Sequence, residues 1–187
     1  AAALLFYMDP GDLIPLAALA AGFHELGHWT AVRLMGGEVR VLRLTVTGGN
    51  MELDHRRPLT YGGELAAILA GPGVNLLLAL LCARLGGERE ALYALSGLSL
   101  ALGWFNLLPI YPLDGGRALL LILSAFTTPG RARQAVWGCS VILVALLLAA
   151  GMSLLWRGGR NLTLPGMALW LLCGLTRREE GRTPVKK

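Results

Sequence analysis

Long apolar runs separated by short polar stretches dominate the chain. An α-helix needs about 20 consecutive, mostly apolar residues to cross the hydrocarbon core of a bilayer, and most of these runs reach that length. The first two runs each end at a pair of glycines, Gly36-Gly37 and Gly86-Gly87, as is typical of a helix C-terminus. The pattern predicts apolar helical segments over residues 12–35, 62–85, 91–126, 134–156 and 162–175.

The third run is too long to form one straight membrane helix. Its 36 residues would extend about 54 Å at the helical rise per residue, whereas a hydrocarbon core is about 30 Å thick. Pro109 and Pro112 lack the amide hydrogen that a helix interior requires, and Gly115 and Gly116 allow unusual dihedral angles. We therefore expect this helix to break within residues 108–116.

A different pattern occupies residues 38–53. Leu42, Leu44 and Val46 alternate with polar side chains, and this period of two is that of a β-strand. The sequence Gly48-Gly49-Asn50 follows as a turn. We predict a short β-hairpin over residues 38–53 that lies at the membrane surface.

Composition supports a membrane protein. Hydrophobic residues make up 55% and charged residues 16% of the 187 residues, against about 45–50% and about 25% in soluble domains. The fold class predicted is an all-α polytopic membrane protein with five to six transmembrane helices and the hairpin, in a single domain over residues 1–187. The sixth helix would be represented by residues 1–8, as the end of a truncated span.

The distribution of basic residues predicts the orientation in the membrane. If the five segments alternate in direction, thirteen of the 17 Lys and Arg residues fall on one side and four fall on the other. Positive charge marks the cytoplasmic side, so the hairpin and the C-terminus are expected in the cytoplasm of a multi-pass cell-membrane protein. This topology also accounts for the net charge of +5 without a nucleic-acid partner.

The pentapeptide His24-Glu25-Leu26-Gly27-His28 carries the most specific chemistry in the chain. Residues four apart lie on one face of a helix, so both imidazoles can reach one metal ion while Glu25 serves as a general base. Neutral imidazole suits zinc. Ionisable groups inside an apolar span mark functional sites, although a polar face hydrogen-bonded within a helix bundle is an alternative explanation.

A catalytic zinc needs a third protein ligand and an open position for water. Asp114, in the broken stretch of the third run, is the strong candidate at membrane depth. Asp is also a common N-cap, so Asp114 has an alternative role as the cap of the helix that follows. Capping and metal binding do not exclude each other.

Three linked motifs resemble the site-2 protease family of intramembrane zinc metalloproteases. They are His24-Glu-Leu-Gly-His28, Gly71-Pro-Gly-Val-Asn75 and Asn106-Leu-Leu-Pro-Ile-Tyr-Pro-Leu-Asp114-Gly-Gly-Arg117, in the family's order. The resemblance implies that His24, His28 and Asp114 hold one Zn²⁺ per chain and that Glu25 is the catalytic base. It implies that Asn75 and Asn106 help to bind substrate.

The spacing of the motifs is similar to that of the compact bacterial branch, which includes the sporulation protease that processes a pro-sigma factor. No PDZ domain fits between His28 and Asp114, and no CBS domain is expected. By this resemblance the chain hydrolyses membrane-embedded or membrane-associated proteins, such as a pro-sigma or anti-sigma factor, near the cytoplasmic face. A membrane zinc-binding or transport protein, and a non-catalytic family member, are the alternatives.

A helical substrate hides its carbonyl groups in internal hydrogen bonds and must be unwound before hydrolysis. We expect the strand that contains Leu42, Leu44 and Val46 to accept the extended substrate by edge pairing. The alternative is that the hairpin only covers the membrane surface.

Overall fold

A computed structural model describes residues 13–37, 39–45, 48–53, 59–156 and 163–180 of the chain. Its elements, in chain order, are α2 (Leu13–Leu34), β1 (Val39–Thr45), β2 (Gly48–Leu53), α3 (Tyr61–Leu85), α4 (Glu90–Asn106), α5 (Asp114–Phe126), α6 (Pro129–Trp156) and α7 (Thr163–Glu180). They divide into two compact units, Ala1–Leu107 and Leu108–Lys187. The expected segment at residues 1–8 lies outside the described residues.

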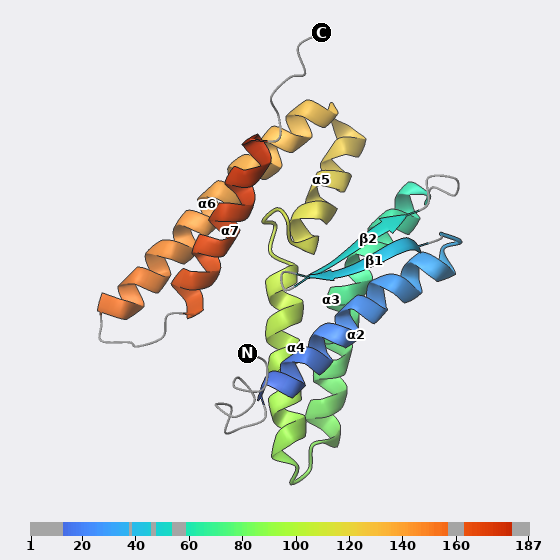
Figure 1. The fold of residues 1–187 in the computed structure, drawn as a ribbon, viewed down its shortest axis with the longest axis vertical. Helices are drawn as coiled ribbons and strands as arrows, with labels where there is room; N and C mark the ends of the chain where they lie inside the picture. The colour runs from blue at the N-terminus through green and yellow to red at the C-terminus, as the bar shows by residue number, and fades with distance from the viewer. Residues whose placement is uncertain (1–12, 38, 46–47, 54–58, 157–162, 181–187) are drawn as a thin grey trace. The chain divides into compact units, whose positions relative to one another are not determined.

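In the first unit, α2, α3 and α4 pack against one another (Figure 1). Ala20, Cys82 and Leu95, one from each helix, form the centre of this packing, and four partly buried leucines surround them. These are Leu16, Leu78, Leu92 and Leu102. The small side chains of Ala20 and Cys82 let the helices approach closely, so the α2 histidines are fixed by a packed three-helix core.

Local sequence signals set the ends of these helices. Gly36 has a φ of 80°, in the left-handed region that favours glycine, and it ends α2. Thr60 caps α3, because its side-chain oxygen accepts a hydrogen bond of 3.1 Å from the Gly63 N–H. Pro72 lies inside α3 and has no N–H to donate to the preceding turn.

Two strands lie within residues 38–53, the range predicted for the hairpin, but the predicted turn residues Gly48, Gly49 and Asn50 belong to the second strand. β1 and β2 pair as antiparallel neighbours, from Val39 opposite Leu53 to Thr45 opposite Gly48. The register shifts between Val39 and Val41. Leu42 and Leu44 lie on β1, whereas Val46 lies outside the described residues. The location of the hairpin at a membrane surface remains a prediction.

The predicted break in the third apolar run is confirmed. α4 ends at Asn106, α5 begins at Asp114, and the residues between them form a loop with turns. In this loop the Ile110 N–H donates to the Leu108 carbonyl (2.7 Å) and the Leu113 N–H donates to the Ile110 carbonyl (2.8 Å). The loop is therefore a folded structure held by its own backbone.

In the second unit, α5 packs against α6, and α6 packs against α7. The two long helices approach closely at Gly151, where an added Cβ would lie 2.9 Å from the Pro165 Cδ. The predicted start of α6 at residue 134 was wrong, because Pro129 begins the helix and proline is favoured at the first helical position. The predicted end of α7 at residue 175 was also wrong, since the helix continues through polar residues to Glu180.

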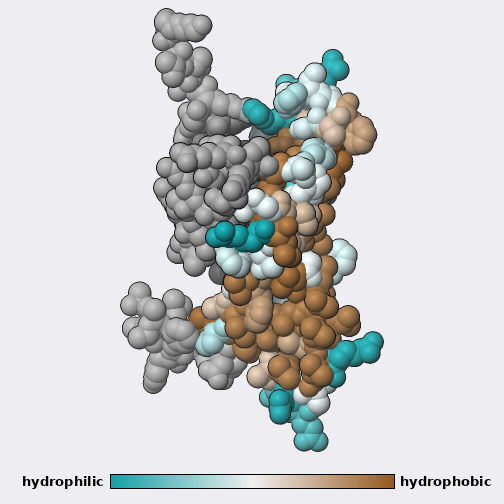
Figure 2. Space-filling view, turned by 90° about the vertical axis from the view of Figure 1, so that its right-hand side faces the viewer, coloured by the Kyte–Doolittle hydropathy of each residue, from teal (hydrophilic) through white to brown (hydrophobic). Residues whose placement is uncertain are grey.

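Two helices of the described part of the chain, α3 and α6, are long and apolar enough to cross a membrane. Their large side chains are extensively exposed, including Leu80 and Leu81 on α3 and Ile142 and Leu146 on α6. Figure 2 shows a broad hydrophobic area on one face of the molecule. Of the five predicted spans, only these two are supported by length and composition; the apolar part of α7, Pro165–Leu175, is shorter.

Candidate metal centre

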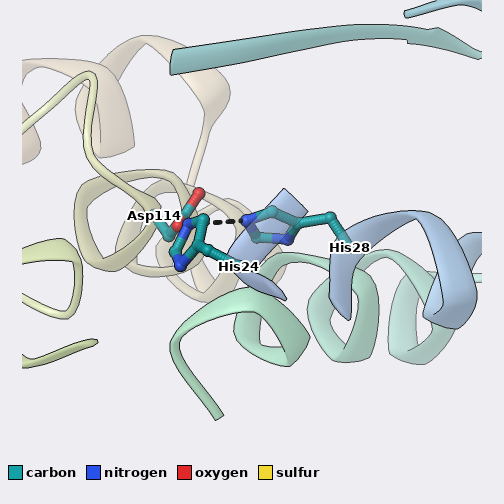
Figure 3. A group of neighbouring side chains, drawn as sticks. All are labelled: His24, His28 and Asp114. Atoms are coloured by element: carbon teal, nitrogen blue, oxygen red, sulfur yellow. Dashed lines mark hydrogen bonds between the residues drawn. The ribbon is translucent and has the colours of Figure 1, made fainter. Parts of the chain in front are cut away.

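The two histidines of the pentapeptide face each other on α2. Their Nε2 atoms are 3.1 Å apart, and the ring planes are nearly perpendicular, at 85° (Figure 3). His24 is buried and His28 is partly buried. The helical spacing of four residues places both imidazoles on one face, as the sequence predicts.

The other ring nitrogen of His28 is held by the next helix. His28 Nδ1 lies 2.8 Å from the Ala67 carbonyl oxygen of α3. A carbonyl only accepts, so Nδ1 carries the proton in this hydrogen bond, and the lone pair of the neutral ring is at Nε2. A backbone contact thus orients the ring and directs its ligand atom toward His24, as outer contacts do in metal sites.

Glycines allow α2 and α3 to approach at this point. A Cβ at Gly71 would overlap the His28 Nε2 atom and lie 2.6 Å from its Cε1 atom, so the imidazole occupies the space that a side chain would take. A Cβ at Gly27 would lie 2.8 Å from the Ala70 carbonyl oxygen and 2.9 Å from the Val74 Cγ2 atom. Gly27 and Gly71 therefore allow α2 and α3 to cross closely at this point.

Glu25 lies next to His24 on α2 and is partly exposed. It is in the helical turn that carries the histidine pair, and a general base at this position must be accessible to water. Partial exposure meets this requirement, whereas the neighbouring His24 is buried. The arrangement suits a general base beside two nitrogen ligands.

Asp114 is the first residue of α5 and is buried. Its carboxylate oxygen Oδ1 lies 3.9 Å from Arg117 Nη1, one turn further along the helix. Leu113, not Asp114, occupies the N-cap position, and it makes no side-chain hydrogen bond to the helix. The alternative role of Asp114 as the N-cap is therefore wrong for this helix, and its carboxylate lies within the first turn, where the helix dipole favours a negative charge.

The two asparagines differ in their surroundings. Asn106 is partly buried at the end of α4, and its Nδ2 donates to the Leu102 carbonyl at 3.0 Å. Asn75 is fully buried on α3, and neither atom of its amide has a hydrogen-bond partner among the described residues. A Cβ at Gly103 of α4 would lie 3.3 Å from the Asn75 Cβ, so Asn75 packs at the α3–α4 interface.

Sequence reasoning missed the backbone contact to His28 and the packing of the loop before Asp114. Pro72 gave no signal for the first, because the carbonyl that its missing N–H leaves without a helical partner is that of Ile68, four residues earlier, and not that of Ala67. For the second, Ser140 on α6 accepts a hydrogen bond from the Tyr111 N–H at 2.9 Å. A serine within an apolar helix gave no hint of which loop it would contact.

The histidine pair fits a zinc ion. Two nitrogen ligands of a tetrahedral zinc, each about 2.0–2.1 Å from the metal, stand about 3.3 Å apart. The observed separation of 3.1 Å is close to this value, and the Ala67 contact leaves the His28 lone pair at the atom that would bind. The two imidazoles of the first unit are therefore arranged to bind one ion.

Comparison with known proteins connects this geometry to a family. Residues 83–149, which include Asn106 and Asp114, match the model of peptidase family M50. Over 119 residues the chain is 34% identical to a zinc metalloprotease of Methanocaldococcus jannaschii, covering 60% of this chain and 34% of the relative. Over 105 residues it is 31% identical to stage IV sporulation protein FB of Bacillus subtilis, covering 54% of this chain and 36% of the relative. These matches thus cover about a third of the length of either relative.

The fold also resembles a solved structure, the site-2 protease from Methanocaldococcus jannaschii. The TM-score is 0.70 at 27% sequence identity, and the alignment covers 94% of this chain and 80% of the other. The resemblance first seen in the three motifs is confirmed by these matches. The chain is thus similar in sequence and fold to a site-2 protease, and residues 83–149 within it match peptidase family M50.

Proposed function

We propose that the chain is an intramembrane zinc metalloprotease that hydrolyses peptide bonds of membrane-embedded or membrane-associated proteins near the cytoplasmic face. The observation that carries the proposal is the pair of facing Nε2 atoms, 3.1 Å apart, on a helix that also presents Glu25. The names of the relatives, among them a zinc metalloprotease and a site-2 protease, support the same chemistry.

In this proposal His24, His28 and Asp114 hold one Zn²⁺ per chain. Two imidazole nitrogens and one carboxylate oxygen form the three-ligand set of a catalytic zinc, which leaves a position for water. The Asp114 carboxylate is buried, as expected of a ligand in a metal site that excludes bulk water. A bound zinc supplies Lewis-acid chemistry, since it polarises a carbonyl oxygen and acidifies water.

The chain's own residues supply the proton transfers. Glu25 accepts a proton from the attacking water and then donates it to the departing amine nitrogen. His28 keeps its orientation through the Ala67 carbonyl and does not need to give up its Nδ1 proton. Asn75 and Asn106 are proposed to bind the substrate backbone; the Asn106 Nδ2 would then exchange its contact with the Leu102 carbonyl for one with the substrate.

Glu25→Gln tests the catalytic assignment. The carboxamide keeps the shape of the side chain but cannot take up the proton, so zinc content should remain at one per chain while cleavage of a panel of single-span substrates is lost. Glu64→Gln is the matched control, because Glu64 is exposed in the first turn of α3, and it should behave as the unmodified protein. A Glu25→Gln protein that still cleaves would overturn the role of Glu25 as the general base. Bound zinc without cleavage by the unmodified protein would overturn the protease assignment and favour a transport protein.

We also propose that the chain crosses the membrane five to six times, with the hairpin and the C-terminus in the cytoplasm. The exposed apolar side chains of α3 and α6 and the thirteen-to-four distribution of basic residues support this topology. Labelling single cysteines from outside the cell tests it. A cysteine near Gly87, between α3 and α4, should react from the outside, whereas one near Arg131 should not.

The hairpin is proposed to bind the substrate as an added strand. β1 and β2 form a two-stranded sheet in the described residues, so each strand has an edge that does not pair with the other. Proline substitutions at successive positions from Val41 to Thr47 test this role. The amide groups of successive residues point to opposite edges of a strand. Proline should therefore lower the cleavage rate at every second position and leave it unchanged at the others, while the zinc content stays constant. Unchanged cleavage at every position would leave the hairpin as a surface cover only.

A further inference from the structure

A buried serine on α6 holds the loop that leads to Asp114. Ser140 is fully buried in the middle of the helix. Its hydroxyl donates to the Val136 carbonyl of the preceding turn at 2.7 Å and accepts from the Tyr111 N–H at 2.9 Å. The first bond is common for a serine in an apolar helix, but the second joins α6 to a backbone group 29 residues away in the sequence.

The hydrogen bond between Ser140 and Tyr111 is linked to Asp114 by the few loop residues between Tyr111 and α5. Ile110, which precedes Tyr111, is fully buried, and its carbonyl accepts the Leu113 N–H. Leu113 directly precedes Asp114 and accepts the Arg117 N–H at 3.0 Å, the first helical bond of α5. The Ser140 hydroxyl therefore fixes one end of a hydrogen-bonded turn, and Asp114 stands at its other end.

The first turn of α5 is packed directly against the same turn. A Cβ at Gly116 would overlap the Ile110 carbonyl carbon and lie 2.5 Å from the Tyr111 nitrogen. The backbone of the loop thus contacts the backbone of the helix that it precedes, and only glycine permits this. A shift of Tyr111 away from α6 cannot be absorbed inside this packing, so it would move the start of α5 as well.

We propose that Ser140 is a positioning residue for Asp114: it binds the Tyr111 N–H and so sets the place of the Asp114 carboxylate relative to α6. The consequence for metal binding rests on the proposed function, in which Asp114 is a zinc ligand. Ser140 does not touch the ion or the substrate. Its effect resembles that of the outer hydrogen bonds that orient ligands in metal sites, whose loss typically costs 10–100-fold in metal affinity.

Three variants of Ser140 test the role of the hydroxyl. Ser140→Thr keeps the hydroxyl, and Ser140→Val has the same shape without it, so any strain from the added methyl group is common to both. Ser140→Ala removes the hydroxyl without adding volume, and it provides the measurement if the larger variants fail to fold. Ser153→Ala is the control on the same helix, because the Ser153 hydroxyl donates to the Ala150 carbonyl and is exposed.

Two readouts besides cleavage are informative. The zinc dissociation constant, measured by competition with a chelator in detergent, should rise about 10–100-fold in Ser140→Val and Ser140→Ala and stay near the unmodified value in Ser140→Thr and Ser153→Ala. Amide hydrogen exchange of peptides covering residues 107–116 should become about tenfold faster in Ser140→Val and Ser140→Ala, as expected for the loss of one hydrogen bond.

The two readouts separate the possible failures. Unchanged exchange in folded Ser140→Ala would overturn the positioning role outright. Faster exchange with an unchanged zinc dissociation constant would also overturn it, because the loop would then be loosened without consequence for the ligand. If the unmodified protein binds no zinc while exchange still responds to Ser140→Ala, the proposed function fails and the contact between Ser140 and the loop stands.

Discussion

Gly71 on α3 provides the space in which the His28 imidazole of α2 lies. A Cβ at Gly71 would overlap the His28 Nε2 atom, so no other residue is compatible with the observed ring position. The same ring donates through Nδ1 to the Ala67 carbonyl, one turn earlier on α3. The face of α3 that carries Ala67 and Gly71 therefore fixes the position of the His28 ring, one of the two proposed nitrogen ligands.

Gly71→Ala should displace the His28 ring and weaken zinc binding. The added methyl group meets a side chain that is itself held by a hydrogen bond, so the ring must leave its position, and we expect the zinc dissociation constant to rise by about 10–100-fold, as for lost outer contacts. Gly73→Ala is the control, because a Cβ there meets nothing within 4 Å. Chelator competition measures both. Equal zinc affinities for the two variants would contradict the claim that zinc binding requires the position of the His28 ring beside Gly71.

Gly27→Ala should destabilise the packing of α2 on α3. Its Cβ would lie 2.8 Å from the backbone oxygen of Ala70, which cannot rotate away, so the helices must separate. Overpacking of this kind costs typically about 1–3 kcal/mol. The same change at Gly22, where a Cβ meets nothing within 4 Å, should be neutral or slightly stabilising, since alanine favours a helix. Thermal unfolding in detergent distinguishes the two, and a Gly27→Ala protein as stable as Gly22→Ala would disprove the close crossing.

Much of this site could be predicted because its signals are local. The spacing of His24 and His28 fixes their shared face through helix geometry alone, and the prolines at 109 and 112 fix the break before Asp114. The contacts of Ala67 with His28 and of Ser140 with Tyr111 join residues 39 and 29 positions apart. No periodicity encodes such pairings, because they arise only when helices pack.

The number of membrane crossings shows a different limit. Composition predicted five spans, but α2 carries the polar groups of the site and Arg33, so its apolar character is weaker than that of α3. The break after Asn106 also divides one long run into helices of 17 and 13 residues. The polar residues of the candidate site thus lower the hydropathy of α2, and hydropathy is the signal by which a membrane-spanning helix is recognised.

Removal of zinc should lower the thermal stability of the protein. A ligand that binds only the folded state at 100 times its dissociation constant adds about 2.7 kcal/mol, so a chelator should lower the unfolding temperature and added zinc should restore it. His24→Ala should remove this response, because one of the two facing nitrogens is lost. His55→Ala, at the remaining histidine of the sequence, should keep it. A chelator response that persists in His24→Ala would place the metal elsewhere.

Asn75→Leu should make the protein more stable and less active. The Asn75 amide is fully buried and unpartnered in the described residues, and such a group costs about 1–3 kcal/mol, whereas leucine of similar volume suits the apolar interface with α4. We expect the free energy of unfolding to rise by about 1–2 kcal/mol while cleavage falls, because the proposed contact with substrate is lost.

Ser99→Ala separates these two effects. Ser99 lies on α4, is fully buried, and its hydroxyl also has no partner among the described residues, but no substrate role is assigned to it. Its replacement should stabilise the protein without loss of cleavage. Loss of cleavage in Asn75→Leu but not in Ser99→Ala would indicate that the Asn75 amide is retained for activity, at a cost in stability. If Asn75→Leu instead destabilises the protein, the amide is satisfied by buried water and its retention is structural.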